Sequence, residues 1–196
     1  MKQVFTKTIL LAILITSFYS CQNRCTCQFE PKTILANDLS INTLSVEESL
    51  WDNYQIPKLA PDSYRLTIVP SYKCQKRVFS LINHPDSIYI ETYILGDSTH
   101  SELIKPDLVM INKFQKAINE SCFWIMESEP EPVLDGTTYL LEGRLSEENS
   151  CSKRVYHFVG RKQGDSTFWA LCDQFLKMAN TSLAEQNAIN HLCWTK

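Results

Sequence analysis

Glu142 is the side chain whose setting in this sequence most favours chemistry. It lies in the segment Leu-Leu-Glu-Gly of an expected strand, where a carboxylate is unusual. A buried acid needs a partner, and Arg144, Arg154 or the backbone amides of the Asp135–Gly136 turn could supply one. We interpret Glu142 as a buried structural acid that fixes this turn. Two alternatives stay open: general acid or base chemistry, and direct contact with a ligand.

The rest of the sequence offers no companion group for catalysis. It contains no G-x-S-x-G elbow, no Gly-rich phosphate loop and no H-E-x-x-H motif. The four histidines are scattered along the chain: His84, His100, His157 and His191. His157 alternates within an expected strand, which favours a surface or satisfied core imidazole over a ligand. We therefore predict no catalytic residue, no cofactor and no metal, with an envelope hydrolase using Glu142 or Asp135 as the opposing alternative.

An acidic, proline-broken stretch follows the apolar segment Phe-Trp-Ile. It contains Glu127, Glu129 and Glu131, and Asp135 follows shortly after. Such a run is usually a solvated loop, but it could also chelate calcium or face a basic partner. We select Glu127, Glu129, Glu131 and Asp135 as candidate contacts of a protein partner.

Charge and composition argue against nucleic acid as a partner. The chain of 196 residues has a formal net charge of −3 and no basic run. Its aromatic residues are not interleaved with Lys or Arg, as they are in many nucleic-acid-binding surfaces. An acidic surface favours, weakly, a basic partner.

The first 21 residues, MKQVFTKTILLAILITSFYSC, have the layout of a secretory signal. A positive start precedes an apolar stretch from Thr8 to Tyr19, and small Ser20 stands directly before Cys21. The apolar stretch is shorter than the roughly 20 residues that a membrane-spanning helix needs. Cleavage after Ser20 by ordinary signal peptidase is one interpretation of this layout.

The small residue before Cys21 also resembles the lipobox of bacterial lipoproteins. Phe18 stands where the usual box has Leu, and looser boxes of this kind occur in lipoproteins of the Bacteroidota. The resemblance implies that Cys21 is lipidated and becomes the mature N-terminus. It also implies a protein anchored in the cell envelope, at the outer membrane. Two or more acyl chains anchor a protein stably.

Eight cysteines in an exported chain favour disulfides. If Cys21 carries lipid, seven remain, so at least one stays free. Cys122 and Cys172 lie in apolar stretches and are interpreted as buried small hydrophobic residues. Cys74 and Cys151 are the preferred pair, and Cys25 or Cys27 could join Cys193. The Cys25-x-Cys27 spacing does not match a structural zinc site.

The hydrophobic pattern predicts one domain behind a signal and a spacer. Residues 1–20 are the signal, 21–63 a lipidated tether and 64–196 a single globular domain. Within that domain the element order is β-β-β-α-β-β-α-α, an α+β fold. It consists of a mainly antiparallel five-stranded sheet with helices packed on one face. The expected strands are 64–70, 77–82, 87–95, 137–144 and 153–160. In the first, Tyr64, Leu66 and Ile68 alternate with Arg65 and Thr67, which indicates a half-buried strand. The expected helices are 106–121, one from 165, with Asp165 and Ser166 as N-cap candidates, and one from 182, where Ser182-Leu-Ala-Glu185 matches a capping box.

A second resemblance covers about residues 64–180. Its pattern is Phe123-Trp124, Asp135-Gly136, Tyr139-x-x-Glu142-Gly143, Tyr156 and Phe168-x-x-Leu171-Cys172. It is similar to a pattern in uncharacterised bacterial proteins, which implies a shared fold and no particular chemistry.

These observations favour a non-catalytic protein-interaction module held at a membrane. Versions of this prediction are an immunity lipoprotein that neutralises a toxin and an accessory lipoprotein of an assembly. For the core, we expect one cluster between sheet and helices, formed by Ile111, Trp124, Phe168, Trp169 and Phe175.

Overall fold

The computed structural model describes residues 58–70, 74–95, 100–128, 137–149, 154–161 and 165–194. These residues form one six-stranded antiparallel sheet with the order β4-β3-β2-β1-β5-β6. The strands are β1 (Ser63–Pro70), β2 (Lys76–His84), β3 (Ser87–Leu95), β4 (His100–Ile104), β5 (Thr137–Arg144) and β6 (Tyr156–Arg161). The helical elements are α3 (Leu108–Glu120), the 3-10 turn η1 (Phe123–Ile125), α4 (Ser166–Met178) and α5 (Leu183–Trp194).

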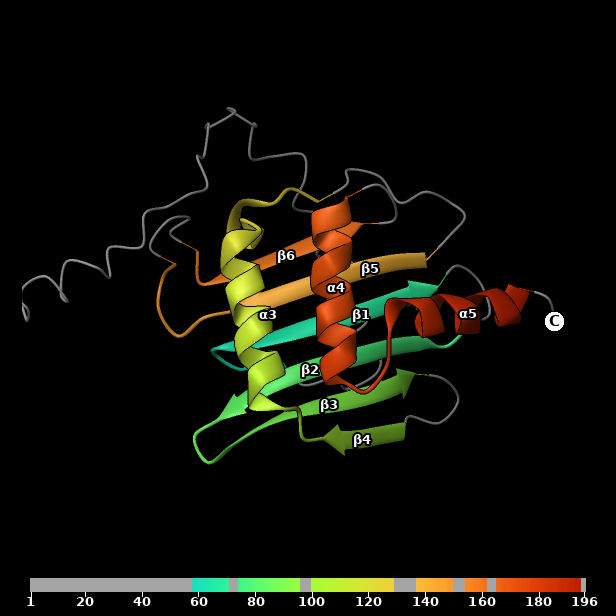
Figure 1. Ribbon diagram of the computed structural model, residues 1–196, viewed down its shortest axis with the longest axis horizontal. Coiled ribbons are helices and arrows are strands. Elements are labelled where there is room, and N and C mark those ends of the chain that lie inside the picture. The colour runs from blue at the N-terminus through green and yellow to red at the C-terminus, as the bar shows by residue number, and fades with distance from the viewer. Residues whose placement is uncertain are drawn as a thin grey trace, which may run out of the picture.

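Two layers make up the described part of the chain (Figure 1). Helices α3 and α4 lie side by side across one face of the sheet, and α5 lies towards the end where β2 and β5 begin. The predicted α+β class, with an antiparallel sheet and helices on one face, is confirmed. The predicted count of five strands is wrong, because β4 forms a sixth strand at the edge of the sheet beside β3. Its sequence, His-Ser-Glu-Leu-Ile, has no clear apolar alternation that would mark a strand.

Strand β1 occupies the middle of the sheet, between β2 and β5. The sequence predicts a half-buried strand with Arg65 and Thr67 on its open face, and this prediction is wrong. Arg65 is 2% exposed and Thr67 is 5% exposed. Their register partners on that face are also buried: Ser80 and Val78 on β2, and Glu142 and Leu140 on β5.

The main hydrophobic core lies between the sheet and the helices. Ile111, Trp124, Phe168 and Phe175 are buried in it, as predicted, and Trp169 is partly buried against it. The rings of Phe114 on α3 and Phe175 on α4 meet edge to face, with centroids 5.2 Å apart. This contact joins the two helices directly above the sheet.

Short polar side chains begin the helices. The Asp107 carboxylate accepts a hydrogen bond from the backbone N–H of Val109 at the start of α3. The predicted cap of α4 is confirmed, since Asp165 accepts from the backbone N–H groups of Thr167 and Phe168. Each cap satisfies amide groups that a helix leaves unpaired at its first turn.

The start of α5 also follows the sequence prediction. The Ser182 hydroxyl accepts a hydrogen bond from the backbone N–H of Glu185, over 3.2 Å. This contact is half of the capping box that the sequence predicts.

Gly143 on β5 permits the close approach of η1 to the sheet. A Cβ atom there would lie 3.0 Å from the rings of Phe123 and Tyr64 and 3.1 Å from the ring of Trp124. The absence of a side chain therefore lets the aromatic residues of η1 pack directly on β5.

Candidate functional site

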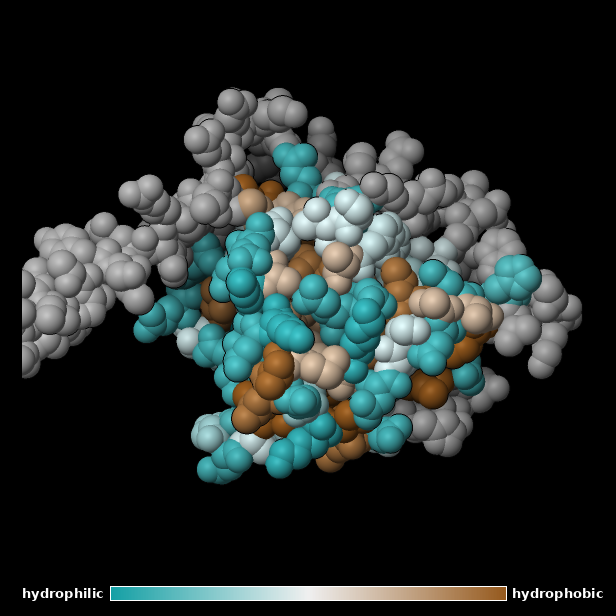
Figure 2. Space-filling model, in the orientation of Figure 1, coloured by the Kyte–Doolittle hydropathy of each residue, from teal (hydrophilic) through white to brown (hydrophobic). Residues whose placement is uncertain are grey.

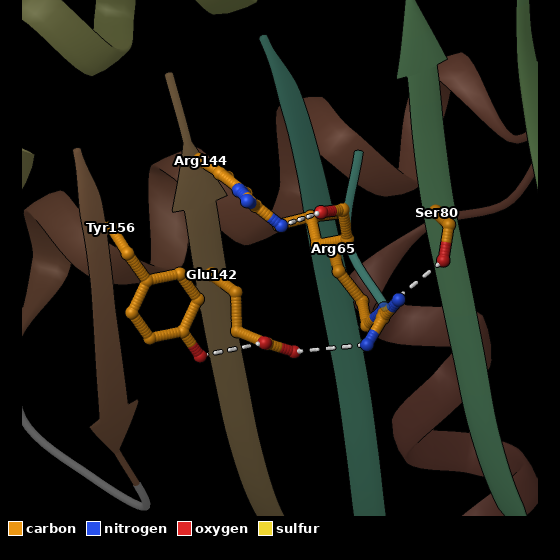
Figure 3. Close-up of polar contacts among 6 residues, drawn as sticks. Arg65, Ser80, Glu142, Arg144 and Tyr156 are labelled. Atoms are coloured by element: carbon orange, nitrogen blue, oxygen red, sulfur yellow. Dashed lines mark hydrogen bonds and ion pairs between the residues drawn. The ribbon is translucent and has the colours of Figure 1, made fainter. Parts of the chain in front are cut away.

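A buried polar cluster crosses four strands on the face of the sheet away from the helices. Glu142 on β5 and Ser80 on β2 are the register partners of Arg65 on β1. Their neighbours in the strands, such as Leu66 and Leu141, join the core under the helices, so the polar side chains point the other way. Figure 3 shows the cluster, with Tyr156 reaching it from the neighbouring strand β6.

The contacts within this cluster link all four strands. Tyr156 donates its hydroxyl hydrogen to Glu142 Oε1 over 2.9 Å, and Arg65 Nη1 lies 4.0 Å from Glu142 Oε2. Arg65 Nε donates to Ser80 Oγ over 3.2 Å. Arg65 and Glu142 are each 2% exposed. The acid is therefore buried opposite a guanidinium rather than in contact with water.

Burial decides the electrostatics of Glu142. Removal from water raises the pKa of its carboxyl group above the ordinary value. The Arg65 guanidinium and the Tyr156 hydroxyl act in the opposite direction and lower that pKa. A general acid or base must lie within hydrogen-bond reach of its substrate. At 2% exposure, the carboxylate makes its contacts inside the protein, and its chemistry is that of a structural link.

The partners that the sequence suggested for Glu142 lie elsewhere. Arg144 donates to the backbone oxygen of Leu59 over 2.9 Å, and Arg154 Nη1 lies 2.8 Å from His157 Nδ1. The Asp135–Gly136 turn lies outside the described residues. The expectation of Arg144 as the partner is wrong: it shares the face of Glu142, but it lies at the end of β5 and its guanidinium reaches Leu59 instead. This hydrogen bond from Arg144 ties Leu59, which is 6% exposed, to the domain.

His157 has partners at both ring nitrogens. Nε2 donates to the backbone oxygen of Met126 over 2.9 Å, which leaves Nδ1 to accept from Arg154. Burial first, and the positive charge of Arg154 second, lower the pKa of His157 to about 4. The imidazole is therefore neutral at pH 7, and both its nitrogens already make hydrogen bonds.

The acidic contact candidates are described only in part. Glu127 is exposed just after η1. Glu129, Glu131 and Asp135 lie outside the described residues. In the described ranges, no three His, Cys, Asp or Glu side chains gather in a way that could hold a metal ion.

The cysteines fall into three groups. Cys172 is free and 0% exposed within α4, where burial first, and the nearby Asp173 second, raise the pKa of its thiol. Cys122 does not match the expectation of a buried, unbridged residue. It is half-buried, adopts φ 60° before η1 and is disulfide-bonded to a cysteine outside the described part of the chain.

Most of the other cysteines considered in the sequence analysis lie outside the described residues. Cys74, half-buried just before β2, carries a thiol that donates to the backbone oxygen of Asn190 over 3.7 Å, so the preferred Cys74–Cys151 disulfide is wrong. Cys21, Cys25, Cys27 and Cys151 lie outside the described residues, as does the side chain of Cys193.

A second polar network, which sequence reasoning missed, joins α5 to the sheet. Arg77 on β2 donates to the Asn190 side chain, whose Nδ2 donates to Thr137 Oγ1 over 3.1 Å. Tyr139 donates to Asn187 Oδ1 over 2.6 Å. A hollow of about 410 Å³ adjoins this network and is lined by Thr137, Tyr139, Trp169, Leu183 and Asn187. The i, i+3 spacing of the two asparagines on α5 was the sequence signal for this polar face.

Three exposed apolar side chains lie near the connection from β4 to α3, on two faces: Leu103 points to the face of the sheet away from the helices, whereas Leu108 and Val109 begin α3. Leu103 is 68% exposed, Leu108 64% and Val109 57%. We call these three residues the α3 corner. Figure 2 shows an apolar patch over the beginning of α3. The corner adjoins β4, which is an edge strand and so has one row of backbone groups facing away from the sheet.

The chain matches no protein-family model, and no curated protein or solved structure shows significant similarity to it. Among the described helices, none combines the length and the apolar character needed to cross a bilayer. The geometry of the described residues is therefore what supports a functional proposal.

Proposed function

We propose that this protein is a lipid-anchored, non-catalytic protein-interaction module of the cell envelope, held at the outer membrane through Cys21. The observation that carries the proposal is the α3 corner. Leu108 and Val109, each more than half exposed, begin α3, and Leu103, also more than half exposed, lies on the opposite face of the adjoining edge strand β4. Exposed apolar groups of this kind, next to polar surface, mark surfaces that partner proteins cover.

The edge strand adds a second means of contact. A partner strand can pair with the outer side of β4 through backbone hydrogen bonds, while its side chains meet Leu103. Natural edge strands are usually protected by charges or by covering segments. In β4 the residue Glu102 supplies one such charge, which favours a partner that brings a positive group to this edge.

The acid–base candidates support a non-catalytic role. Glu142 is paired with Arg65 and Tyr156 and is 2% exposed. His157 has both nitrogens engaged. These groups stabilise the sheet, and neither presents a proton-accepting atom to the outside. The opposing hydrolase would have to rely on Asp135.

The acidic stretch gives the proposal its second contact surface. Exposed Glu127, with Glu129, Glu131 and Asp135, would meet the basic surface of a partner such as a toxin, which is the immunity version of the proposal. Because rim charges mainly change the rate of association, and buried apolar anchors carry most of the affinity, the two surfaces make different predictions.

The test uses the full-length protein in its own membrane. A photo-crosslinking residue is placed at Leu108 and, as a matched apolar control on α5, at Ile189, which is 45% exposed. We expect one specific protein adduct at position 108, none at 189, and loss of the adduct when Val109, which is exposed beside Leu108, is changed to Asp. The triple change of Glu127, Glu129 and Glu131 to Lys should slow formation of the adduct.

Two results would overturn the proposal. Equal adducts at positions 108 and 189 would show that the α3 corner is not a docking surface. The anchor is tested separately: labelled palmitate should enter the wild-type protein and not Cys21→Ser, and equal labelling would remove Cys21 as the lipid site. A hydrolytic activity abolished by Asp135→Asn would favour the enzyme class instead.

A further inference from the structure

The face of the sheet away from the helices, which we call the far face, is closed to water. Six of its side chains, on the three central strands β2, β1 and β5, are at most 6% exposed: Arg65, Thr67, Val78, Ser80, Leu140 and Glu142. An antiparallel sheet that is covered on one side alone has a second face in contact with solvent. The burial of the far face therefore requires a covering layer.

The described helices lie on the opposite face and do not supply that layer. Helices α3 and α4 pack in the main core with Ile68 of β1. Helix α5 bonds Arg77 and Tyr139, which are the two register partners of Ile68. Register partners share a face of the sheet, so all three helices lie on the side of Ile68 (Figure 1). Among the described residues, no helix or strand lies on the far face.

A second hydrophobic cluster lies on the far face. Val78 and Leu95 are 0% and 3% exposed, and Tyr93 packs against them. Small clusters of this kind, separate from the main core, usually lie under long loops. Leu103 lies on the same face at the β4 edge and is 68% exposed. The covering layer therefore extends over β5, β1 and β2 as far as the end of β3, and it leaves β4 open.

The chain enters the domain on this same face. Arg144, on the side of β5 that carries Glu142, donates to the backbone oxygen of Leu59 over 2.9 Å, and Leu59 is 6% exposed. Asp62, in the turn directly before β1, has a φ of 55°. Its carboxylate accepts from the backbone N–H of Ser146 over 2.9 Å, which holds the turn. The residues before Leu59 therefore reach β1 from over the far face.

Length identifies the covering segment. Within the domain, the connections outside the described residues are 71–73, 96–99, 129–136, 150–153 and 162–164. The longest, 129–136, starts beside β6, where Ser128 accepts from the backbone N–H of Gly160, and ends at β5. Three strand spacings of about 4.8 Å separate β5 from β3. The eight residues of 129–136, fully extended, reach about 28 Å, which crossing that distance and returning would use up. The chain before Leu59 has no such limit.

We propose that residues 44–57 pack on the far face as a third layer of the domain. The segment leads directly into Lys58 and Leu59 and carries a run of large apolar side chains: Leu44, Val46, Leu50, Trp51, Tyr54 and Ile56. Packed over Val78 and Leu140, these side chains bury apolar surface on both sides of the contact, which stabilises the domain. They also exclude water from the pair formed by Arg65 and Glu142.

The covering layer limits where a partner can bind. With residues 44–57 in place, the far face over β5, β1 and β2 is not available to another protein. The exposed apolar side chains of the α3 corner and the edge of β4 then remain for the proposed interaction. The tether between Cys21 and the domain shortens to residues 22–43. The packing itself depends neither on lipidation nor on the proposed function, so it is tested apart from both.

A photo-crosslinking residue at Tyr93 tests which segment covers the far face. Benzoylphenylalanine replaces this aromatic side chain in the full-length protein, which is purified, irradiated, reduced, alkylated and digested with trypsin. The matched control carries it at Leu103, on the same face and in the same tryptic peptide, 78–113. We expect a link from position 93 to peptide 33–58, located by fragmentation within 44–57, and loss of that link at position 103.

Four results of this experiment would overturn the proposal. A link to residues 129–136 or 22–43 in place of 44–57 would assign the cover to a different segment. Equal yields from positions 93 and 103, or no link from position 93 to peptide 33–58, would show that residues 44–57 are not held on this face. The linked product should have the mass of a monomer on a denaturing gel, since a dimer would mean that a second copy supplies the cover.

A charge within the segment gives a second measurement, which needs no crosslinker. Trp51→Asp places a carboxylate against the apolar side chains of the far face and should lower the melting temperature by on the order of 5–10 °C. The control Phe29→Asp, in the chain before residue 44, should change it by no more than about 2 °C. Equal shifts in the two variants, or no shift for Trp51→Asp, would contradict the packing of residues 44–57 on the sheet.

Discussion

Replacement of Glu142 by Leu tests whether the buried cluster is a stabilising link. The change leaves the Arg65 guanidinium buried at 2% exposure without its carboxylate. Removal of one partner from a buried ion pair typically costs about 3–5 kcal/mol, because the remaining charge is uncompensated. It also removes the acceptor of the Tyr156 hydroxyl. We expect a loss of about 4 kcal/mol in the free energy of unfolding, measured by urea at pH 7.

The companion changes distinguish a charge effect from a loss of packing. Arg65→Met with Glu142→Leu removes both charges and keeps apolar bulk, so the double variant should lie within about 1 kcal/mol of the wild type. Arg65→Met alone leaves an acid whose pKa is already raised by burial. That acid can take up a proton on acidification, whereas arginine cannot lose one. The cost of Arg65→Met should therefore grow as the pH rises above the carboxyl group's ordinary range. The cost of Glu142→Leu should instead fall as the pH rises, because the wild type has the raised carboxyl pKa and the variant lacks the group.

The control is a solvent-exposed ion pair of similar length. Lys116 Nζ and Glu120 Oε1 on α3 lie 3.6 Å apart, with side chains 74% and 67% exposed. Glu120→Gln should change stability by no more than about 0.5 kcal/mol, since water and salt screen such pairs. Our reasoning fails if Glu142→Leu costs less than about 1 kcal/mol, or if the double variant loses the sum of the two single losses.

The remaining predictions concern a histidine and the core. The pKa of His157 is lowered from 6.5 to about 4, so the folded chain binds fewer protons than the unfolded chain between these values, and stability falls as the pH drops through them. Urea titrations at pH 7 and pH 4.5 should show that His157→Gln loses about 2–3 kcal/mol less on acidification than the wild type; equal losses in the two proteins would contradict the assignment. Phe175 is 0% exposed, so Phe175→Ala should cost about 3–5 kcal/mol by the same assay, against about 0.5 kcal/mol or less for Val109→Ala at the surface. A loss under about 1 kcal/mol at Phe175 would place the core elsewhere.

Local patterns predicted most of the elements. The strands 87–95 and 137–144 have the bounds that alternation indicated, and the caps at Asp165 and Ser182 start their helices. These features depend on residues within a few positions of each other. Strand β4 was not predicted because it is an edge strand that pairs with β3 alone, and its short sequence shows no alternation of apolar and polar residues.

The candidate site was predictable only in part, because its contacts are long-range. An acid within a strand was visible at Glu142, and its burial followed from the apolar residues around it. The contact of Arg65 with Glu142 was not predictable, because it depends on β1 lying against β5, and residues 71–136 separate the two strands in the sequence. Arg65 alternates with apolar residues just as a solvent-facing arginine would. The polar network of α5 was not predicted for the same reason: Asn190 bonds Arg77 and Thr137, which lie in distant parts of the chain.

The central place of β1 also has a consequence for the order in which the chain acquires its structure. Strands β1 to β4 pair as successive hairpins and need only nearby partners. The other edge of β1 has to wait for β5, and such long-range pairing makes folding slow. Until residues 137–144 arrive, Arg65 has no carboxylate and β1 has an open edge. The sheet of a nascent chain is thereby incomplete until nearly three quarters of the chain has been made, a delay that would suit the proposed export, because an exported chain crosses a membrane unfolded.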